Sequence, residues 1–397
     1  MTPKIVLQKN RKKRLEQGHP WVYASEVQHV DGDVAPGSIV DIHNHQGVFL
    51  AKGYANPASQ LYARVLSYVQ DEAIDTAFLI RRMEQAAAYR TRILENPSYC
   101  RVIYGEADFL PGLIVDRYGE WLVVQILSYG MENLKPNLLE ALVHVFQPKG
   151  IYLRNDVPVR RLEGLPEETG LWYGTVPRYI DIVEHGLHFT ADVYEGQKTG
   201  YFYDQRDNRA AIFPIVKDAQ RVLDCFCHTG GFAMHAARGG AEHVTAVDIS
   251  EAAIEVAREN ARRNQLSERI DFQAANAFDF LREAEQEGAV YDVVILDPPA
   301  FAKSRRALPG AIRGYKEINL RGCKLVRDGG FLVTASCSFH MRPELFQETI
   351  LSAAFDAHKI LRTVRWSGAA PDHPEIAGVD EGHYLKFAIY QVFHRGT

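Results

Sequence analysis

The sequence has few cysteines and no long apolar run, and each absence excludes a class of protein. Its five cysteines among 397 residues are odd in number and irregularly spaced, which favours reduced thiols over a disulfide framework. No apolar run approaches the roughly 18 to 20 residues that span a bilayer. Residues 1–17 also lack the apolar core of a signal peptide. We therefore expect a cytoplasmic protein without a membrane segment.

Paired metal ligands and an overall excess of positive charge are missing as well. Cys225 and Cys227 form a C-x-C pair, but no second pair follows at zinc-ligand spacing, so no metal is expected. The net charge is −5, yet "KNRKKR" at residues 9–14 carries five bases. Such a cluster is typical of phosphate binding, and a solvated basic turn is the alternative.

The pattern of the chain changes twice along its length, which predicts three domains. Residues 1–72 contain short apolar runs separated by Gly, Pro and Asn, which is typical of a small β-barrel or sandwich. Residues 73–188 mix helical and strand patterns and predict a small α+β domain. Residues 189–397 become an alternation of strands and helices from about residue 220. That alternation predicts an α/β domain with a parallel sheet, whose ligands bind at the carboxyl ends of the strands.

The first strand ends of this α/β domain indicate a nucleoside-containing cofactor. The loop "DCFCHTGGF", residues 224–232, places Gly230 and Gly231 between a strand and a helix, where the backbone can approach a ligand closely. Asp248 ends the next strand, where an acid can accept hydrogen bonds from both hydroxyls of a ribose. Asn276 follows the third strand and can face an adenine. A structural glycine turn and a helix-capping aspartate are the alternatives.

Two later strand ends carry candidate catalytic residues. The fourth strand ends in "DPPAF", residues 297–301, where two prolines fix the loop and hold the Asp297 carboxylate at the crevice. Cys337 stands between two serines in "TASCSFH", residues 334–340, at the end of the adjacent apolar run. A small buried residue at a strand end is the alternative for this cysteine.

These motifs together carry a family resemblance. The pattern D-x-F-x-x-T-G-G-F, the ribose acid, D-P-P and the late S-C-S resemble class I S-adenosylmethionine methyltransferases that act on RNA. More closely, the chain resembles the large-subunit ribosomal RNA cytosine-5 methyltransferase I family. The likeness covers nearly the whole length through "GHPWVYASEV", "ARVLS", "GEADFLPGLIVDRYG", "GQKTGYFYDQRDNR", "DHP" and "EGHYLK".

The resemblance implies a fold, a cofactor and a set of site residues. It implies an N-terminal PUA domain at 1–72, a linker domain at 73–188 and a Rossmann-like methyltransferase domain at 189–397. The implied partners are S-adenosylmethionine and large-subunit ribosomal RNA, and a homodimer is left open. The implied cofactor-binding residues are Asp224, Phe226, Thr229, Gly230, Gly231, Asp248, Asn276, Ala277 and Asp297. Cys227 and His228 depart from the expected loop, and Asn276 stands where relatives often carry Asp.

The resemblance also assigns chemistry to Cys337 and Asp297. A thiolate that adds to carbon 6 of cytosine makes carbon 5 nucleophilic, and Asp297 would hydrogen-bond the edge of the base. Related enzymes with D-A-P-C use a second cysteine for product release, but this chain has Ala300 there. The base must leave its stack, so single-stranded RNA is expected, and the five bases of residues 298–316 suit its phosphates.

Two other functions remain open from the sequence. An exocyclic-amine methyltransferase uses a similar Asp/Asn-Pro-Pro motif with an aromatic directly after the prolines and needs no thiol. In this chain that position is Ala300, and Phe301 follows one residue later. The second alternative is a non-catalytic RNA-binding or ribosome assembly protein, which would bind no cofactor.

Overall fold

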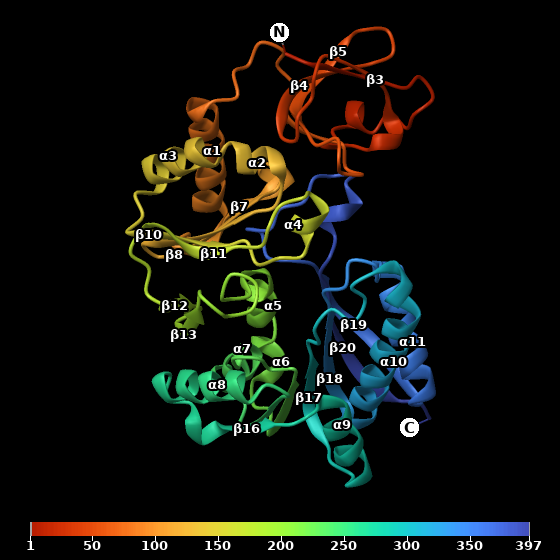
Figure 1. The fold of residues 1–397 in the computed structure, drawn as a ribbon. Coiled ribbons are helices and arrows are strands. Elements are labelled where there is room, and N and C mark those ends of the chain that lie inside the picture. The colour runs from red at the N-terminus through yellow and green to blue at the C-terminus, as the bar shows by residue number, and fades with distance from the viewer. Residues whose placement is uncertain (1, 397) are drawn as a thin grey trace. The chain divides into compact units, whose positions relative to one another are not determined.

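The computed structural model describes residues 2–396, apart from the side chain of Glu381, and divides them into two compact units. The first unit comprises residues up to 182 together with 191–203 and 371–380. The second comprises 183–190, 204–370 and the chain from 381 onwards. Figure 1 shows the elements of each unit. No helix in this described range is long and apolar enough to cross a membrane.

The N-terminal part of the first unit is a six-stranded sheet, as its short apolar runs predict. The strand order is β2-β6-β5-β4-β1-β3. The pairs β4–β5 and β5–β6 are antiparallel, and β1 pairs with β4 in parallel. The bounds are β1 (Lys4–Leu7), β2 (Trp21–Val22), β3 (Val27–Asp31), β4 (Ser38–His43), β5 (Phe49–Ala55) and β6 (Ala63–Ser67).

A second sheet with helices follows in the same unit. Its order is β11-β10-β9-β8-β7, and the hairpin predicted at "LPGLIVDRYGEWLVVQIL" is confirmed as the antiparallel pair β8–β9. The strands are β7 (Tyr99–Tyr104), β8 (Leu113–Tyr118), β9 (Trp121–Ile126), β10 (Gly150–Arg154) and β11 (Thr169–Gly174). The helices are α1 (Thr76–Ile93), α2 (Tyr129–Asn133), α3 (Lys135–Phe146) and α4 (Val159–Leu162). A hairpin of β12 (Tyr179–Glu184) and β13 (Leu187–Asp192) comes next in the chain.

The two sheets of the first unit share buried contacts. Tyr54 on β5 belongs to the same apolar core as α1 and β7, and its hydroxyl donates to the Pro111 carbonyl at 2.7 Å. Arg64 on β6 donates to the Glu163 carboxylate at 3.0 Å, and both side chains are buried. The N-terminal sheet therefore rests on the residues that follow it, and cutting the chain near residue 72 would expose this core.

The C-terminal motif "DHP" also belongs to the first unit. Asp372 accepts a hydrogen bond from the backbone N–H of Arg101 at 2.9 Å, and its carbonyl accepts one from the Arg90 guanidinium. Arg90 is fully buried and also pairs with Asp108. The chain thus returns to the first unit for residues 371–380 before it finishes in the second. The division into three domains stays a prediction.

The second unit is built on a seven-stranded sheet. Its order is β16-β15-β14-β17-β18-β20-β19, with parallel pairing from β16 to β18. The alternation of strands and helices predicted from residue 220 is confirmed. The strands are β14 (Arg221–Cys225), β15 (His243–Asp248), β16 (Ile270–Ala274), β17 (Tyr291–Leu296), β18 (Val326–Ser336), β19 (Lys359–Ser367) and β20 (Lys386–His394). The helices are α5 (Arg206–Ala210), α6 (Phe213–Val216), α7 (Gly231–Arg238), α8 (Glu251–Arg263), α9 (Ala277–Gln286), α10 (Leu308–Leu325) and α11 (Pro343–Asp356).

The last strand enters the sheet in the opposite direction. β20 inserts between β18 and β19 and is antiparallel to both. In this register Lys386 at the start of β20 lies opposite Ser336 at the end of β18. The start of β20 is therefore brought to the same edge of the sheet as the carboxyl ends of the parallel strands, where ligands of such folds bind.

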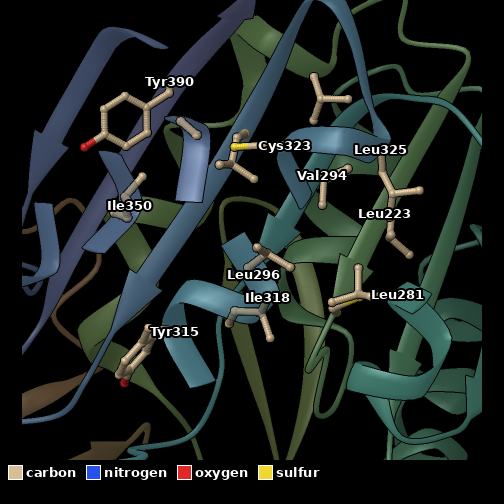
Figure 2. Close-up of a cluster of buried hydrophobic side chains, with 14 of the residues drawn as sticks. Leu223, Leu281, Val294, Leu296, Tyr315, Ile318, Cys323, Leu325, Ile350 and Tyr390 are labelled. Carbon is tan, nitrogen blue, oxygen red and sulfur yellow. The ribbon is translucent and has the colours of Figure 1, made fainter. Parts of the chain in front are cut away.

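A continuous apolar core fixes these strand ends. Figure 2 shows part of this core, with side chains from the sheet packed against α9, α10 and α11. Strands buried on both faces are apolar throughout, which explains the run "VVIL" in β17. The labelled side chains are Leu223, Leu281, Val294, Leu296, Tyr315, Ile318, Cys323, Leu325, Ile350 and Tyr390.

Candidate active site

The loop after β14 adopts a backbone that glycine makes possible. Gly230 has φ of +84°, and a Cβ there would lie 3.3 Å from side-chain atoms of Ala257 and Phe272. It precedes α7, whose first backbone N–H groups have no partner within the helix. Phe226 and His228 in the same loop also have positive φ. The loop "DCFCHTGGF" is therefore a tight turn of defined shape rather than a flexible linker.

Asp248 ties this loop to the end of β15. One carboxylate oxygen accepts from the His228 backbone N–H at 2.9 Å, and the other accepts from the Ser250 N–H at 2.9 Å. Ser250 caps α8, so Asp248 is not the helix cap. Each carboxylate oxygen has a further lone pair, and the side chain is only half-buried. Asp248 can therefore accept two ribose hydroxyls without losing its own contacts.

Asp224 is a buried acid without a side-chain partner in the described part of the chain. It is 0% exposed, and neither carboxylate oxygen has a side-chain donor among the described residues; the Ala233 backbone is the one donor group nearby. Burial raises its pKa well above the ordinary range, and the nearby charges of Asp297 and Asp248 raise it further. Three carboxyl groups therefore share one region, which is an environment that attracts a cation.

Asn276 and Ala277 occupy the start of α9. The Asn276 side chain is exposed and caps the helix by accepting from the Phe278 N–H at 2.9 Å. Ala277 is 4% exposed and packs into the core. The cap uses the Asn276 carbonyl oxygen, which leaves its amide group as the side-chain donor that could reach a ligand. A contact of Asn276 or Ala277 with adenine stays a prediction.

Aromatic rings join three of the strand ends. Phe226 after β14, Phe278 on α9 and Phe301 after β17 have ring centroids 5.8 to 6.3 Å apart. Phe301 also packs against Tyr315 on α10, with centroids 4.7 Å apart. These contacts hold the loops that carry the predicted cofactor and catalytic residues in a fixed arrangement.

The structure brings Cys337 to the D-P-P loop. Its Sγ lies 3.8 Å from the Pro298 carbonyl oxygen, as the pairing of β17 with β18 predicts. Of the five cysteines, all free thiols, Cys337 alone is not fully buried. Burial raises the pKa of Cys323 to about 12. It also raises the pKa of Cys225 and Cys227 well above the usual range.

The serine after Cys337 explains part of the motif around it. The Ser338 hydroxyl is buried, accepts from the Ala302 backbone N–H at 3.1 Å and lies 2.9 Å from the Tyr315 hydroxyl. The Ser338 N–H in turn donates to the Ser336 hydroxyl at 3.3 Å. The two serines therefore fix the backbone on either side of Cys337, and Ser338 ties it to the loop after β17 and to α10.

Two residues that the sequence did not single out complete this arrangement. Gln205 donates to the Asp297 carboxylate at 2.8 Å, and its own carbonyl oxygen accepts from Asn208 at 2.7 Å. Lys386 is 2% exposed and donates to the Ser338 carbonyl at 2.7 Å, next to Cys337. Both lie in stretches quoted for the family resemblance, "DQRDNR" and "EGHYLK", and that was the only signal in the sequence.

One group of metal-capable side chains occurs in the described part of the chain. Glu184, His185 and His235 bring one ligand atom each within 4.8 Å of one another. Arg209, however, binds both Glu184 oxygens at 2.6 and 2.7 Å, and His235 bonds the Gly231 carbonyl and the His185 ring. None of these residues was predicted as a site from the sequence. Because their ligand atoms are engaged in hydrogen bonds to one another and to Arg209, we interpret the group as an internal polar network and not as a metal site.

Comparison with known proteins gives the family. A family model for S-adenosylmethionine-dependent methyltransferases matches residues 157–390, and one for PUA-like domains matches residues 5–68. Ribosomal RNA large subunit methyltransferase I of Tolumonas auensis is 43% identical, over 97% of this chain and 98% of its own. The protein of that name from Escherichia coli O139:H28 is 42% identical over the same shares. The chain belongs to this family.

Solved structures support the fold of this methyltransferase. A SAM-dependent methyltransferase from Streptococcus mutans superposes with a TM-score of 0.82 at 19% identity, over 98% of this chain and 100% of its own. A methyltransferase complexed with SAH gives 0.83 at 19% identity over the same shares. The predicted PUA-like domain and Rossmann-like methyltransferase fold are thus confirmed.

S-adenosylmethionine is the cofactor of this family, and the residues described above fit it. It carries a sulfonium and an ammonium group, which suit the three carboxyl groups of Asp224, Asp248 and Asp297. Its ribose carries two hydroxyls, which suit the free lone pairs of Asp248. The glycine turn before α7 leaves room for the backbone to approach a ligand.

Removing the Asp248 carboxylate should weaken cofactor binding. We expect Asp248→Ala to raise the Kd for S-adenosylmethionine at least tenfold, about 1.4 kcal/mol, because a charge-assisted contact with ribose is lost. Isothermal titration calorimetry measures this, with Asp271→Ala, an exposed acid on β16, as the matched control. Equal affinities for wild type and a folded Asp248→Ala protein would remove Asp248 from the cofactor site.

Proposed function

We propose that this methyltransferase forms 5-methylcytosine in large-subunit ribosomal RNA through a covalent adduct of Cys337. The observation that carries the proposal is the position of the thiol. Cys337 is the one accessible cysteine, and its Sγ lies 3.8 Å from the backbone of the D-P-P loop that follows β17. The names of the relatives supply the RNA class, since they are ribosomal RNA large subunit methyltransferases I.

The thiol solves a chemical difficulty of the reaction. Carbon 5 of cytosine is a poor nucleophile, but when the Cys337 thiolate adds to carbon 6, the ring electrons move so that carbon 5 can attack an electrophile. The bound cofactor supplies an electrophilic methyl group. A base, such as water, then takes the carbon 5 proton, the bond between carbon 6 and sulfur breaks, and the Cys337 thiolate leaves as the aromatic ring is restored. The reaction therefore requires a nucleophile that can reach carbon 6 and a fixed hydrogen-bond acceptor that holds the edge of the base.

Asp297 is the acceptor that would hold the base. Gln205 donates to one of its carboxylate oxygens at 2.8 Å, and Asn208 holds Gln205 in turn. Asn208 is itself fixed by the Gly368 carbonyl and the Ser367 hydroxyl. A carboxylate held in this way can accept from the cytosine amino group and so hold the base in a fixed position while the thiolate adds.

The ring arrangement favours this chemistry over methylation of an exocyclic amine. That chemistry places an aromatic ring directly after the prolines, next to the target base, and here the position is Ala300. The nearest ring, Phe301, packs against Phe226, Phe278 and Tyr315. A ring engaged on several sides is poorly placed to stack on a base.

Exposed bases near the D-P-P loop suit the RNA backbone. Lys303, Arg305, Arg306 and Arg313 are exposed, whereas Lys316 pairs with Asp356 at 2.7 Å. In the N-terminal run, Arg11 pairs with Glu16, and Arg14 lies over the Tyr23 ring. The other three bases of that run, Lys9, Lys12 and Lys13, are exposed.

Labelled methyl transfer tests the substrate class. We expect the protein to transfer the labelled methyl group of S-adenosylmethionine to large-subunit ribosomal RNA stripped of its proteins. Transfer to small-subunit RNA should be much weaker. If the cofactor bound but no label entered either RNA, the non-catalytic alternative would gain support.

Substituting the exposed lysines should weaken RNA binding in a salt-dependent way. Each phosphate contact on single-stranded RNA contributes about 0.7 to the magnitude of the slope of log K against log salt. A triple variant with Lys9→Ala, Lys12→Ala and Lys13→Ala should therefore reduce the magnitude of this slope by about 2. Fluorescence anisotropy across a salt series measures the slope. A triple variant at exposed lysines elsewhere, Lys149, Lys217 and Lys324, is the control. An unchanged slope in the N-terminal variant would make "KNRKKR" a solvated turn.

A further inference from the structure

We propose that Lys386 stabilises the thiolate form of Cys337 and so sets the pH at which this cysteine becomes a nucleophile. The inference rests on the proposed function, because it deepens the role given to Cys337. It makes Lys386 a positioning residue that acts through the thiol. No part of the proposed chemistry described above assigns a cation to the thiol.

The geometry places the amine at the end of β18. Lys386 begins β20 opposite Ser336, and its Nζ donates to the Ser338 carbonyl at 2.7 Å and to the Tyr384 carbonyl at 2.8 Å. One partner, Ser338, directly follows Cys337 in the loop after β18, and the other, Tyr384, lies two residues before Lys386. An ammonium group has three donors, so one remains for a group beside these carbonyls.

Burial makes this lysine unusual and increases the effect of its charge. The side chain is 2% exposed, yet no carboxylate binds it among the described residues. Burial lowers its pKa to about 8, and the charge on the Cys337 thiolate acts in the opposite direction. Charges interact more strongly in a poorly solvated site than at the surface, so a buried cation beside a thiol favours loss of the thiol proton.

Other titratable groups lie on the surrounding elements. The Tyr315 hydroxyl on α10 bonds Ser338, and burial raises its pKa, with the Cys337 charge acting in the same direction. Tyr384 donates to the Asp204 carboxylate at 2.6 Å. On β19 the exposed Arg365 bonds Ser367, and after β17 the Asp297 carboxylate binds Gln205. Among these groups, Lys386 is the cation in contact with the residue that follows the thiol.

The proposed step is a simple proton loss. The S–H bond of Cys337 breaks, its proton passes to water, and the sulfur keeps the electron pair that later attacks carbon 6. Lys386 keeps its own proton and faces the resulting anion. When the reaction ends, the thiolate is released again and the same charge pair is restored.

The pH dependence of alkylation tests this pairing directly. The rate at which iodoacetamide modifies Cys337 follows the thiolate fraction, and mass spectrometry of the peptide that contains Cys337 reads it separately from the buried cysteines. Lys386→Gln retains donors for the Ser338 and Tyr384 carbonyls but removes the charge. We expect it to shift the midpoint of the curve of alkylation rate against pH upward by at least one pH unit. At a pH well below both midpoints, a shift of one unit makes alkylation about tenfold slower.

Further variants separate loss of charge from loss of structure. Lys386→Met removes both charge and donors and should shift the midpoint at least as far as Lys386→Gln. Lys359→Met removes a lysine on β19 whose charge acts on Cys323, and should leave the Cys337 midpoint unchanged. Melting curves identify variants that fail to fold.

The two possible failures are distinguishable because alkylation needs neither cofactor nor RNA. The same midpoint in wild type and in a folded Lys386→Gln protein would overturn the proposal for Lys386, whatever product the enzyme forms. A shifted midpoint in an enzyme that forms no 5-methylcytosine would retain the charge pair and overturn only the proposed function.

Discussion

Replacing Cys337 with alanine is expected to abolish both methyl transfer and covalent trapping of RNA. Without the thiolate, carbon 5 cannot be activated, so turnover should fall on the order of 10³-fold or more, at least 4 kcal/mol in the barrier. RNA with 5-fluorocytosine at the target should form a stable complex with wild-type protein, because fluorine cannot leave as a proton. Denaturing gel electrophoresis detects that complex, and the complex should require S-adenosylmethionine.

The control for this variant is a buried thiol. Cys323→Ala removes a fully buried side chain on α10 and should lower stability by about 1 kcal/mol or more while leaving trapping intact. Trapping that persisted in Cys337→Ala would show that another residue attacks the base. Trapping lost equally in both variants would indicate damage to the fold.

Replacing Asp297 with asparagine is expected to cost about 10²- to 10³-fold in kcat. The substitution retains an oxygen for the Gln205 amide but removes the charged acceptor for the cytosine amino group, and losses of this size follow removal of one electrostatic contact. Single-turnover assays with saturating RNA and cofactor measure the chemical step.

A second variant separates the charge of Asp297 from its position. Gln205→Ala leaves the carboxylate but removes its donor, so we expect a smaller loss, about tenfold, through misplacement of the acceptor. If Asp297→Asn turned over at the wild-type rate, the carboxylate would have no part in holding the base, and Gln205 would serve only the fold.

The elements of the second unit were predictable because their patterns are strong. The last four residues of β17 are apolar and buried, as expected for a strand covered on both faces. Ser250 followed by Glu251 marks the start of α8 as a cap and an acid in the first turn. Pairing of β17 with β18 then places Asp297 and Cys337 at one edge, because parallel strands end together.

The supporting residues were not predictable because they depend on long-range pairing. Lys386 reaches the end of β18 only because β20 runs antiparallel between β18 and β19, and nothing in its local sequence specifies that insertion. Gln205 bonds Asp297 across 92 positions of the chain. A sequence read one segment at a time shows neither contact.

Some residues that the sequence did indicate as ligand-binding candidates are partly engaged in local interactions. The side-chain carbonyl oxygen of Asn276 caps a helix, and Arg11 in "KNRKKR" forms an ion pair with Glu16, five positions along the chain. Charge and amide counts cannot reveal such competition, since caps and ion pairs form only when the backbone brings the partners together.

The most direct test of the central claim is the identity of the methylated nucleoside. Large-subunit ribosomal RNA methylated by the purified protein would be digested to nucleosides and analysed by chromatography and mass spectrometry against standards. The account predicts 5-methylcytidine as the new product, formed by wild type and absent with Cys337→Ala. A methylated exocyclic amine, such as N4-methylcytidine, formed equally well by Cys337→Ala, would contradict it.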